Sequence, residues 1–181
     1  MFNASLRQIL LALLTAHVLL LVSSTSNLVG AQFVRDKQLT FYHTHTGKTL
    51  DIVYFRDGAY DEDALAEVNA FLADFRTGDV ATIDRNLLDI LHDIRQALGS
   101  NGTYEVISAY RSPKTNEMLR ASSSGVASNS QHLLGKAIDV RLRGIPTETL
   151  RDAALAMKRG GVGYYESSDF VHIDNGRIRS W

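Results

Sequence analysis

The 181-residue sequence contains no cysteine and only two prolines. Without cysteine no disulfide can form and no thiol nucleophile exists, so histidine and carboxylate side chains are the remaining candidates for binding a metal ion. The formal net charge is −1, and this balance lacks the excess of positive charge that favours nucleic-acid binding. These absences indicate a globular protein that is stabilised by core packing and does not bind nucleic acid.

The first 31 residues differ in composition from the rest of the chain. They begin with a segment that holds one charge, Arg7, continue with an almost entirely apolar stretch at 9–22, and end in small and polar residues. This three-part pattern is typical of a secretory signal peptide. The apolar stretch is shorter than the about 20 residues of a membrane span. We therefore expect signal peptide 1–31, an exported periplasmic domain 32–181, and no stable membrane insertion after cleavage; an uncleaved signal would tether the protein to the membrane.

Hydrophobic periodicity predicts both strands and helices. Strands are expected at 39–45, 49–55, 104–110, 136–142, 162–165, 170–174 and 177–181. Helices are expected at 61–76, 84–98, 115–121 and 147–159. The Asn175-Gly176 pair predicts a hairpin turn between the last two strands. Because strands lie at both ends with helices grouped between them, the order favours an α+β fold in one domain.

Two imidazoles and one carboxylate stand out as candidate metal ligands: His132, Asp139 and His172. Asp139 and His172 occupy the polar positions of two alternating strands, so they share one face if those strands pair. Gly135 allows the chain to turn so that His132 folds back over Asp139. Such a set is typical of a catalytic zinc site with one position open for water. The alternative is ordinary structure, a hydrogen-bonded buried histidine and a salt-bridged aspartate.

The residues around these ligands carry a family resemblance. The pattern Ser130-x-His132-x2-Gly135-x-Ala137-x-Asp139, with Tyr110-Arg111-Ser112 before it and His172 after it, resembles the D-alanyl-D-alanine carboxypeptidase-like zinc peptidases. Within that group the chain resembles the YcbK-like murein endopeptidases (the MepK family). Further segments match in order: 45–47, 108–112, 115–116, 160–165, 170–174 and Trp181.

The resemblance implies a fold, a cofactor and a substrate. It implies a small antiparallel sheet that carries the zinc site and is flanked by helices. It implies that His132, Asp139 and His172 bind Zn²⁺, and that the substrate is the cross-linked peptide of peptidoglycan. Endopeptidase cleavage of cross-links, particularly between two diaminopimelate residues, is expected over carboxypeptidase trimming of stem peptides (D,D or L,D), which is the alternative. No protein partner is indicated.

Roles outside the ligand set are expected for Arg111 and Ser130. The Arg111 guanidinium is suited to stabilising a carbonyl oxygen as it becomes an oxyanion, or to holding a substrate carboxylate. A surface arginine at a strand end is the alternative interpretation. We expect Ser130 to orient a ligand or the loop that carries it.

Two carboxylates compete for the role of general base. Asp169 lies three residues before His172, where related zinc carboxypeptidases have a glutamate or aspartate. Asp174 lies two residues after His172, so in a strand it points the same way and could equally orient an imidazole. Glu166 is a weaker third candidate. Because the base is uncertain, a non-catalytic, zinc-stabilised domain that binds the cell wall is the rival function.

Other residues that attract notice have simpler explanations. His43 and His45 alternate onto one strand face, but they lack a third partner, so we expect a structural role. The Tyr164-Tyr165 pair could line a substrate groove or pack against the sheet, and the sequence does not separate these two placements.

Overall fold

The structure, a computed structural model, describes residues 35–122 and 126–181, so the predicted signal peptide lies outside the described residues. The strands are β1 (Lys37–His43), β2 (Thr49–Arg56), β3 (Ala59–Tyr60), β4 (Tyr104–Ser108), β5 (Ala137–Leu142), β6 (Gly161–Tyr165), β7 (Phe170–Asp174) and β8 (Arg179–Ser180). The helices are α2 (Glu62–Phe71), α3 (Arg85–Ala97), α4 (Pro113–Ser122) and α5 (Thr147–Met157), with short 3-10 helices η1 (Gln131–Leu134) and η2 (Glu166–Ser168).

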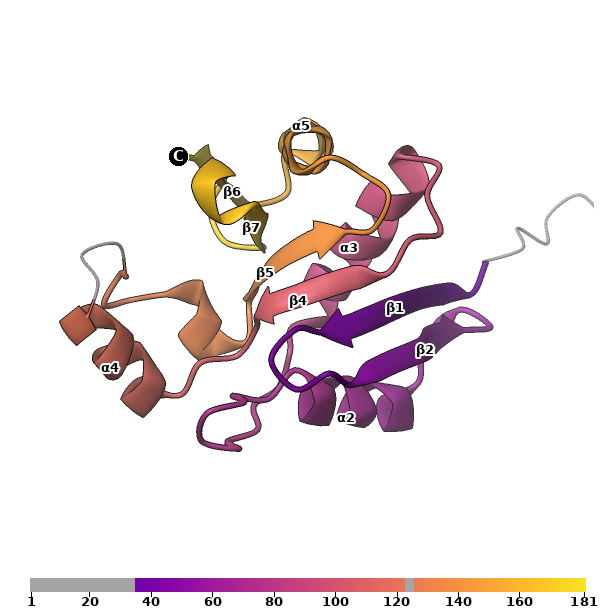
Figure 1. The fold of residues 1–181 in the computed structure, drawn as a ribbon. Helices are drawn as coiled ribbons and strands as arrows, with labels where there is room; N and C mark the ends of the chain where they lie inside the picture. The colour runs from indigo at the N-terminus through magenta and orange to yellow at the C-terminus, as the bar shows by residue number, and fades with distance from the viewer. Residues whose placement is uncertain (1–34, 123–125) are drawn as a thin grey trace, which may run out of the picture. The chain divides into compact units, whose positions relative to one another are not determined.

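The strands form one eight-stranded sheet in the order β3-β2-β1-β4-β5-β7-β6-β8, which confirms the predicted α+β class. Its centre, β4-β5-β7-β6, is antiparallel as expected. Two pairs are parallel, β1 with β4 and β6 with β8, so the sheet is mixed rather than antiparallel throughout. β1 and β4 are separated by β2, β3, α2 and α3, and this connection brings the chain to the end of the sheet at which β1 begins (Figure 1). β4 therefore runs in the same direction as β1.

The predicted hairpin at Asn175-Gly176 was wrong. β8 pairs with β6 rather than with β7, because β7 already has β5 on one edge and β6 on the other. The Gly176 amide instead donates to Asp174 Oδ1 (2.8 Å), so the aspartate side chain directs the turn. The chain then crosses to the free edge of β6. This crossing brings Arg179 and Trp181 close to β7 and to His172.

Helix boundaries follow local capping signals and tertiary contacts. Asp61 caps α2 by accepting from the amides of Asp63 and Ala64 (both 3.1 Å). The predicted helix extended to Arg76, but α2 ends at Phe71. The chain leaves the helix because the two carboxylate oxygens of Asp74 hold other segments. Oδ1 accepts from the Arg76 amide (3.0 Å), and Oδ2 accepts from the amide of Ser112, in the segment that follows β4 (2.8 Å). Long-range hydrogen bonds therefore override the helical periodicity after residue 72.

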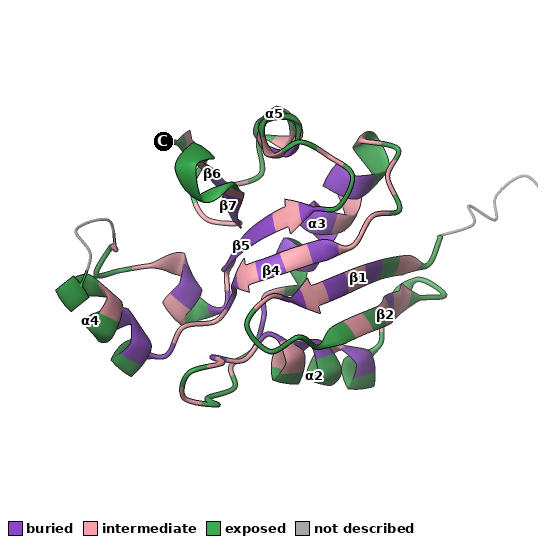
Figure 2. Cartoon of the chain, in the orientation of Figure 1, coloured by how far each residue is buried: buried purple, intermediate pink, exposed green. Residues whose placement is uncertain are grey.

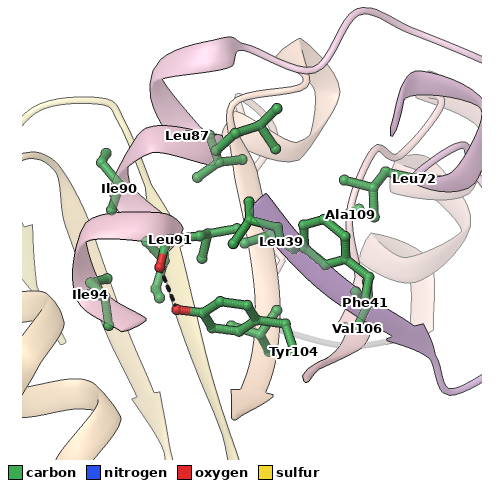
Figure 3. Close-up of a cluster of buried hydrophobic side chains, with 14 of the residues drawn as sticks. Leu39, Phe41, Leu72, Leu87, Ile90, Leu91, Ile94, Tyr104, Val106 and Ala109 are labelled. Carbon is green, nitrogen blue, oxygen red and sulfur yellow. Dashed lines mark hydrogen bonds between the residues drawn. The ribbon is translucent and has the colours of Figure 1, made fainter. Parts of the chain in front are cut away.

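The hydrophobic core lies between one face of the sheet and helices α2, α3 and α5. Figure 2 shows the buried residues concentrated on the strands and on the helix surfaces that pack against them. In Figure 3 the Tyr104 ring lies beneath α3 and its hydroxyl donates to the Leu91 carbonyl (2.7 Å). Burial of each large apolar side chain of this cluster contributes roughly 2 kcal/mol. Packing against the helices fixes the position of the strands. The candidate ligands project from the other face of the sheet, opposite the helices.

No helix within 35–122 or 126–181 is long and apolar enough to cross a membrane.

Candidate metal centre

His132 is positioned by the short helix η1. Ser130 caps the start of the helix, and its Oγ accepts from the His132 amide (3.3 Å). Gly135 caps the end in the left-handed conformation with φ 65°. A Cβ at Gly135 would lie 2.1 Å from the Thr82 carbonyl oxygen, so only glycine fits this turn. The expected turn at Gly135 is therefore confirmed, and it folds His132 back over β5. Ser130 holds the loop by capping η1.

Asp139 and His172 are positioned by strand register. They are direct partners in the antiparallel β5–β7 pair, so their side chains project together from the face opposite the helices. A bulge in β4 between Val106 and Ser108 brings Ser108, rather than its predecessor, opposite Asp139. Bulges re-aim side chains in this way because an extra residue shifts the alternation of faces. The expectation that Asp139 and His172 share a face is confirmed.

The three candidate ligands converge on one point. His132 Nε2 lies 3.2 Å from His172 Nδ1, and His172 Nδ1 lies 2.8 Å from Asp139 Oδ1. The third separation, from His132 Nε2 to Asp139 Oδ1, is 3.3 Å. These residues are the group of histidine and acidic side chains that meets the geometry of a metal site within the described part of the chain.

The outer contacts of the two imidazoles determine which nitrogens face inward. His132 Nδ1 lies 2.6 Å from the Ala109 carbonyl, and His172 Nε2 lies 3.0 Å from Asp174 Oδ2. Both partners can only accept, so each of these nitrogens carries a hydrogen. In the neutral rings the inward nitrogens, Nε2 of His132 and Nδ1 of His172, then present lone pairs to each other and to the Asp139 carboxylate. Three acceptors at such distances repel one another unless a proton or a metal ion lies between them, and two imidazole nitrogens with one carboxylate oxygen are a donor set that fits a metal ion such as zinc.

Burial and charge within the cluster act in opposite directions. His132, Asp139 and His172 are 1%, 4% and 7% exposed. Burial lowers the pKa of His132. For Asp139, burial would raise the pKa, but the adjacent imidazoles outweigh it and hold the pKa far below its usual range. For His172, burial is likewise outweighed, in this case by hydrogen bonds to two carboxylates that raise its pKa. The ionised carboxylate that a metal ligand needs is therefore favoured at neutral pH.

Arg111 binds the far side of the candidate carboxylate ligand. Its Nη2 donates to Asp139 Oδ2 (2.7 Å), and its Nε donates to Ser108 Oγ (2.9 Å). Its backbone amide donates to the His132 carbonyl (3.1 Å), which ties the Arg111 segment to η1. The sequence suggested a role toward substrate; the structure adds that Arg111 leaves only Oδ1 of Asp139 facing the imidazoles.

A cavity of about 460 Å³ opens beside the cluster. Its lining comes from the segment after β4, from residues 126–130, from η1, β5, β6 and β7, and from the segment around β8. It comprises Arg111, Val126, Ala127, Asn129, Ser130, Gln131, His132, Asp139, Tyr165, Phe170, His172, Arg179 and Trp181. The three candidate ligands therefore lie at the wall of a space large enough for a peptide segment.

The predicted bases lie in different places. Asp174 is 1% exposed, and its carboxylate accepts from His172, from the amides of Gly161 and Gly176, and from Arg179 Nη2 (2.6 Å). These contacts outweigh the effect of burial and hold its pKa well below the usual range. The structure therefore brings Asp174 to the cluster of candidate ligands, behind His172 rather than at the cavity.

Asp169 and Glu166 lie outside the cluster. Asp169 is exposed in the turn before β7, where its carboxylate accepts from Thr147 Oγ1 (2.7 Å) and pairs with Arg141 Nε (3.4 Å). Glu166 is exposed in η2. Neither residue is part of the cavity lining described above.

Some site residues escaped the sequence reasoning. Arg179 pairs with Asp174 through both Nη atoms, and Trp181 donates from Nε1 to the Tyr165 hydroxyl (3.0 Å). Trp181 was noticed only as part of the family resemblance. Arg179 had no signal, because its proximity to Asp174 depends on β8 crossing to β6. Of the tyrosine pair, Tyr165 lines the cavity, whereas Tyr164 lies under the Arg151 guanidinium (4.7 Å).

The amino-terminal histidines are separate from the cluster. His43, the last residue of β1, is 1% exposed, and its ring centroid lies 5.4 Å from that of Phe75. His45 is exposed and stacks on the other residue of this contact, Phe75, with a centroid distance of 4.1 Å. Neither belongs to the candidate metal group. Burial and the neighbouring His45 lower the pKa of His43, so the ring is neutral at neutral pH.

Comparison with known proteins adds an independent line of evidence. A sequence family described as "Peptidoglycan L,D-endopeptidase MepK" matches residues 31–181. A protein of Escherichia coli K12 named peptidoglycan L,D-endopeptidase MepK is 42% identical over 147 residues, which is 81% of both chains. A Haemophilus influenzae protein named probable peptidoglycan L,D-endopeptidase MepK is 40% identical over 144 residues, or 79% of this chain and 77% of that protein.

Proposed function

The chain belongs to the family described as peptidoglycan L,D-endopeptidase MepK, and from this membership we propose that it is a zinc-dependent endopeptidase that cleaves peptide cross-links of peptidoglycan. The observation that carries the proposal is the convergence of His132 Nε2, His172 Nδ1 and Asp139 Oδ1 within 3.3 Å of one another at the wall of a cavity. The family makes the chain a peptidoglycan hydrolase; the metal and the cleaved bond are the finer parts of the proposal.

These three atoms would hold the zinc ion. When bound, zinc supplies a Lewis acid that polarises a carbonyl and lowers the pKa of water to about 7. The protein contributes the orientation of the ligands. The Ala109 carbonyl and the Asp174 carboxylate keep a hydrogen on the outward nitrogen of each imidazole, so the inward lone pairs stay available.

Arg111 has a double role in this proposal. Two of its nitrogens hold Asp139 and Ser108, and Nη1 has no hydrogen-bond partner among residues 35–122 and 126–181. Because Arg111 lines the cavity, Nη1 is the nitrogen that we propose donates to the substrate. A guanidinium there stabilises negative charge on the scissile carbonyl oxygen, or holds a carboxylate of the substrate. Because its carboxylate partner anchors it, the group needs little rearrangement as the charge develops.

The proton of the attacking water needs an acceptor, and Asp169 and Asp174 stay the predicted candidates. The contacts of Asp174 favour a positioning role, since its carboxylate already accepts from His172, Arg179 and two backbone amides. Asp169 is tied to Thr147 and Arg141 and would have to leave them to reach the cavity. Substitution of each residue separately distinguishes the two roles.

The cellular setting follows from the substrate. Peptidoglycan lies outside the cytoplasmic membrane, so we propose that residues 1–31 act as a secretory signal and that 32–181 is the periplasmic peptidase domain. The MepK relatives are named L,D-endopeptidases, which favours cross-links between two diaminopimelate residues over removal of terminal residues from stem peptides.

Incubation of the zinc-loaded protein with purified sacculi tests the proposal. We expect cross-linked muropeptides to be converted into uncross-linked ones, with diaminopimelate–diaminopimelate links lost first and no free D-alanine released. The matched control is His172→Ala, which lacks one proposed ligand, with circular dichroism used to confirm that the variant is folded. Binding to sacculi without cleavage by the folded, zinc-loaded protein would instead support the non-catalytic wall-binding domain. Release of D-alanine from intact stem peptides would support a carboxypeptidase.

A further inference from the structure

Trp181 is held beside the candidate ligand His172 by its backbone and by its ring. Its amide donates to the Val162 carbonyl (3.3 Å), and its carbonyl accepts from the Tyr164 amide (3.0 Å). Its ring centroid lies 5.1 Å from that of His172. The indole lies on Gly163, where a Cβ would approach its Cε2 to 2.6 Å. The absence of a side chain at Gly163 therefore makes room for the indole beside a candidate metal ligand.

The same indole controls the hydroxyl of Tyr165. Trp181 Nε1 can only donate, so the Tyr165 oxygen accepts this hydrogen bond (3.0 Å) and its own proton is left to be donated elsewhere. The Tyr165 ring stacks on Phe170 with centroids 4.5 Å apart and planes 16° apart, which fixes its direction. Tyr165 and Trp181 both line the cavity next to His172.

Exposure indicates that this pair faces a ligand. Trp181 is 51% exposed although Arg179 packs over one part of the ring at 4.9 Å and His172 lies beside it. An indole used only for core packing would be largely buried, because the hydrophobic gain depends on the area removed from water. Here a rigidly held apolar surface remains open at the cavity and adjoins an oriented hydroxyl donor.

We propose that Trp181 and Tyr165 determine specificity by binding the diamino acid next to the scissile bond, an inference that rests on the proposed function. The indole face contacts the methylene chain of the diamino acid, and the Tyr165 hydroxyl donates to a carbonyl or carboxylate oxygen at its end. A diamino acid suits Trp181 and Tyr165 because its side chain has an apolar methylene segment and a polar end. Because Trp181 contacts the candidate ligand His172, a diamino acid bound on the indole would lie next to the bond that is cleaved.

Kinetics of the zinc-loaded full chain on a purified muropeptide dimer joined by a diaminopimelate–diaminopimelate bond test the inference. Trp181→Ala removes contact with about two methylene groups, which corresponds to an increase in KM of about tenfold. Tyr165→Phe keeps the ring and removes the donor, so kcat/KM should fall about three- to tenfold. Tyr164→Phe is the matched control, because that ring lies on the other side of β6 under Arg151.

Three further readings separate this role from a structural one. Zinc stoichiometry and Tm of Tyr165→Phe should equal those of the wild-type protein. Trp181→Phe removes the indole N–H, and the double variant with Tyr165→Phe should lose less than the sum of the single losses, since the two groups share one hydrogen bond. Wild-type kcat/KM in Tyr165→Phe and Trp181→Ala would overturn the inference, as would losses that only track lost zinc. If the wild-type protein does not cleave the dimer, the proposed function fails instead.

Discussion

Replacing Asp174 with asparagine tests how His172 is held in the metal centre. Both oxygens of the Asp174 carboxylate accept hydrogen bonds: Oδ2 from His172 Nε2 (3.0 Å) and Arg179 Nη2 (2.6 Å), and Oδ1 from the Gly161 and Gly176 amides (3.1 and 2.8 Å). An asparagine side chain has one acceptor oxygen and one NH₂ group, so a donor must face a donor on one side.

The magnitude follows from these contacts. The amide also removes the charge that opposes the Arg179 guanidinium and that strengthens the hydrogen bond from His172. Loss of an outer partner of a ligand histidine lowers metal affinity about 10- to 100-fold. This range corresponds to about 1.4–2.7 kcal/mol of binding free energy. Because Asp174 is buried, solvent cannot replace the lost acceptor, so we expect Asp174→Asn to lie toward the upper part of the range.

Competition with a chromophoric zinc chelator measures this change directly. Wild-type protein, Asp174→Asn and Asp169→Asn are titrated side by side at neutral pH, and circular dichroism confirms that each is folded. Asp169→Asn is the matched control, since its carboxylate contacts Thr147 and Arg141 rather than a ligand. Zinc affinity of Asp174→Asn within twofold of the wild-type value would refute the positioning role.

Activity at saturating zinc then separates positioning from proton transfer. If Asp174 only orients His172, the Asp174→Asn variant recovers most of its kcat once zinc is saturating. A kcat that stays low in Asp174→Asn with zinc fully bound would instead identify Asp174 as the general base. The corresponding loss in Asp169→Asn, with unchanged zinc affinity, would identify Asp169 as the base.

Three other predictions concern the ligands and the scaffold. His132→Ala should lose both bound zinc and cleavage, whereas His43→Ala should keep one zinc ion per chain by elemental analysis; full zinc content in His132→Ala would refute the ligand assignment. Hydrogen bonds outweigh burial and lower the pKa of Asp74 to about 2, so its carboxylate stabilises the fold at neutral pH and this contribution is lost as pH falls from about 4 toward 2. In urea unfolding, Asp74→Asn should therefore cost about 2 kcal/mol at pH 7 and much less at pH 2, and a pH-independent difference would contradict this origin. Gly135→Ala should cost at least about 2 kcal/mol, because alanine is strained at φ 65° and meets the Thr82 carbonyl, and an unchanged urea midpoint would contradict the fit at this turn.

Local patterns accounted for most of the secondary structure. Alternating apolar residues predicted β5 and β7 to within one residue, and the spacing of leucines and isoleucines predicted α3. The errors arose where distant contacts override local preference. α2 ends early because the segment after it binds the chain that follows β4, and β8 pairs with β6 because both edges of β7 are occupied. Neither the contact with the segment after β4 nor the pairing of β8 with β6 can be predicted from the residues adjacent in sequence.

The candidate site was predictable in composition but not in geometry. His132, Asp139 and His172 were recognised from their residue types, from strand alternation and from the surrounding motif. The contact of Asp174 with His172 was one of the two alternatives that strand alternation left open. The bidentate contact of Arg179 was not recognised, because it depends on how β8 crosses the sheet. The bulge that turns Ser108 toward Arg111 had no sequence signal either.

The amino-acid sequence by itself determined which chemistry is available. The absence of cysteine left histidine and carboxylate ligands, and Gly135 permitted the turn that returns His132 to β5. The tertiary structure alone decided which nitrogen of each imidazole faces the centre, because the Ala109 carbonyl and the Asp174 carboxylate come from separate segments. It also decided that Trp181 covers Gly163 beside His172. The physical reason is that residue types set the donors and acceptors, whereas strand register and edge pairing set which of them meet.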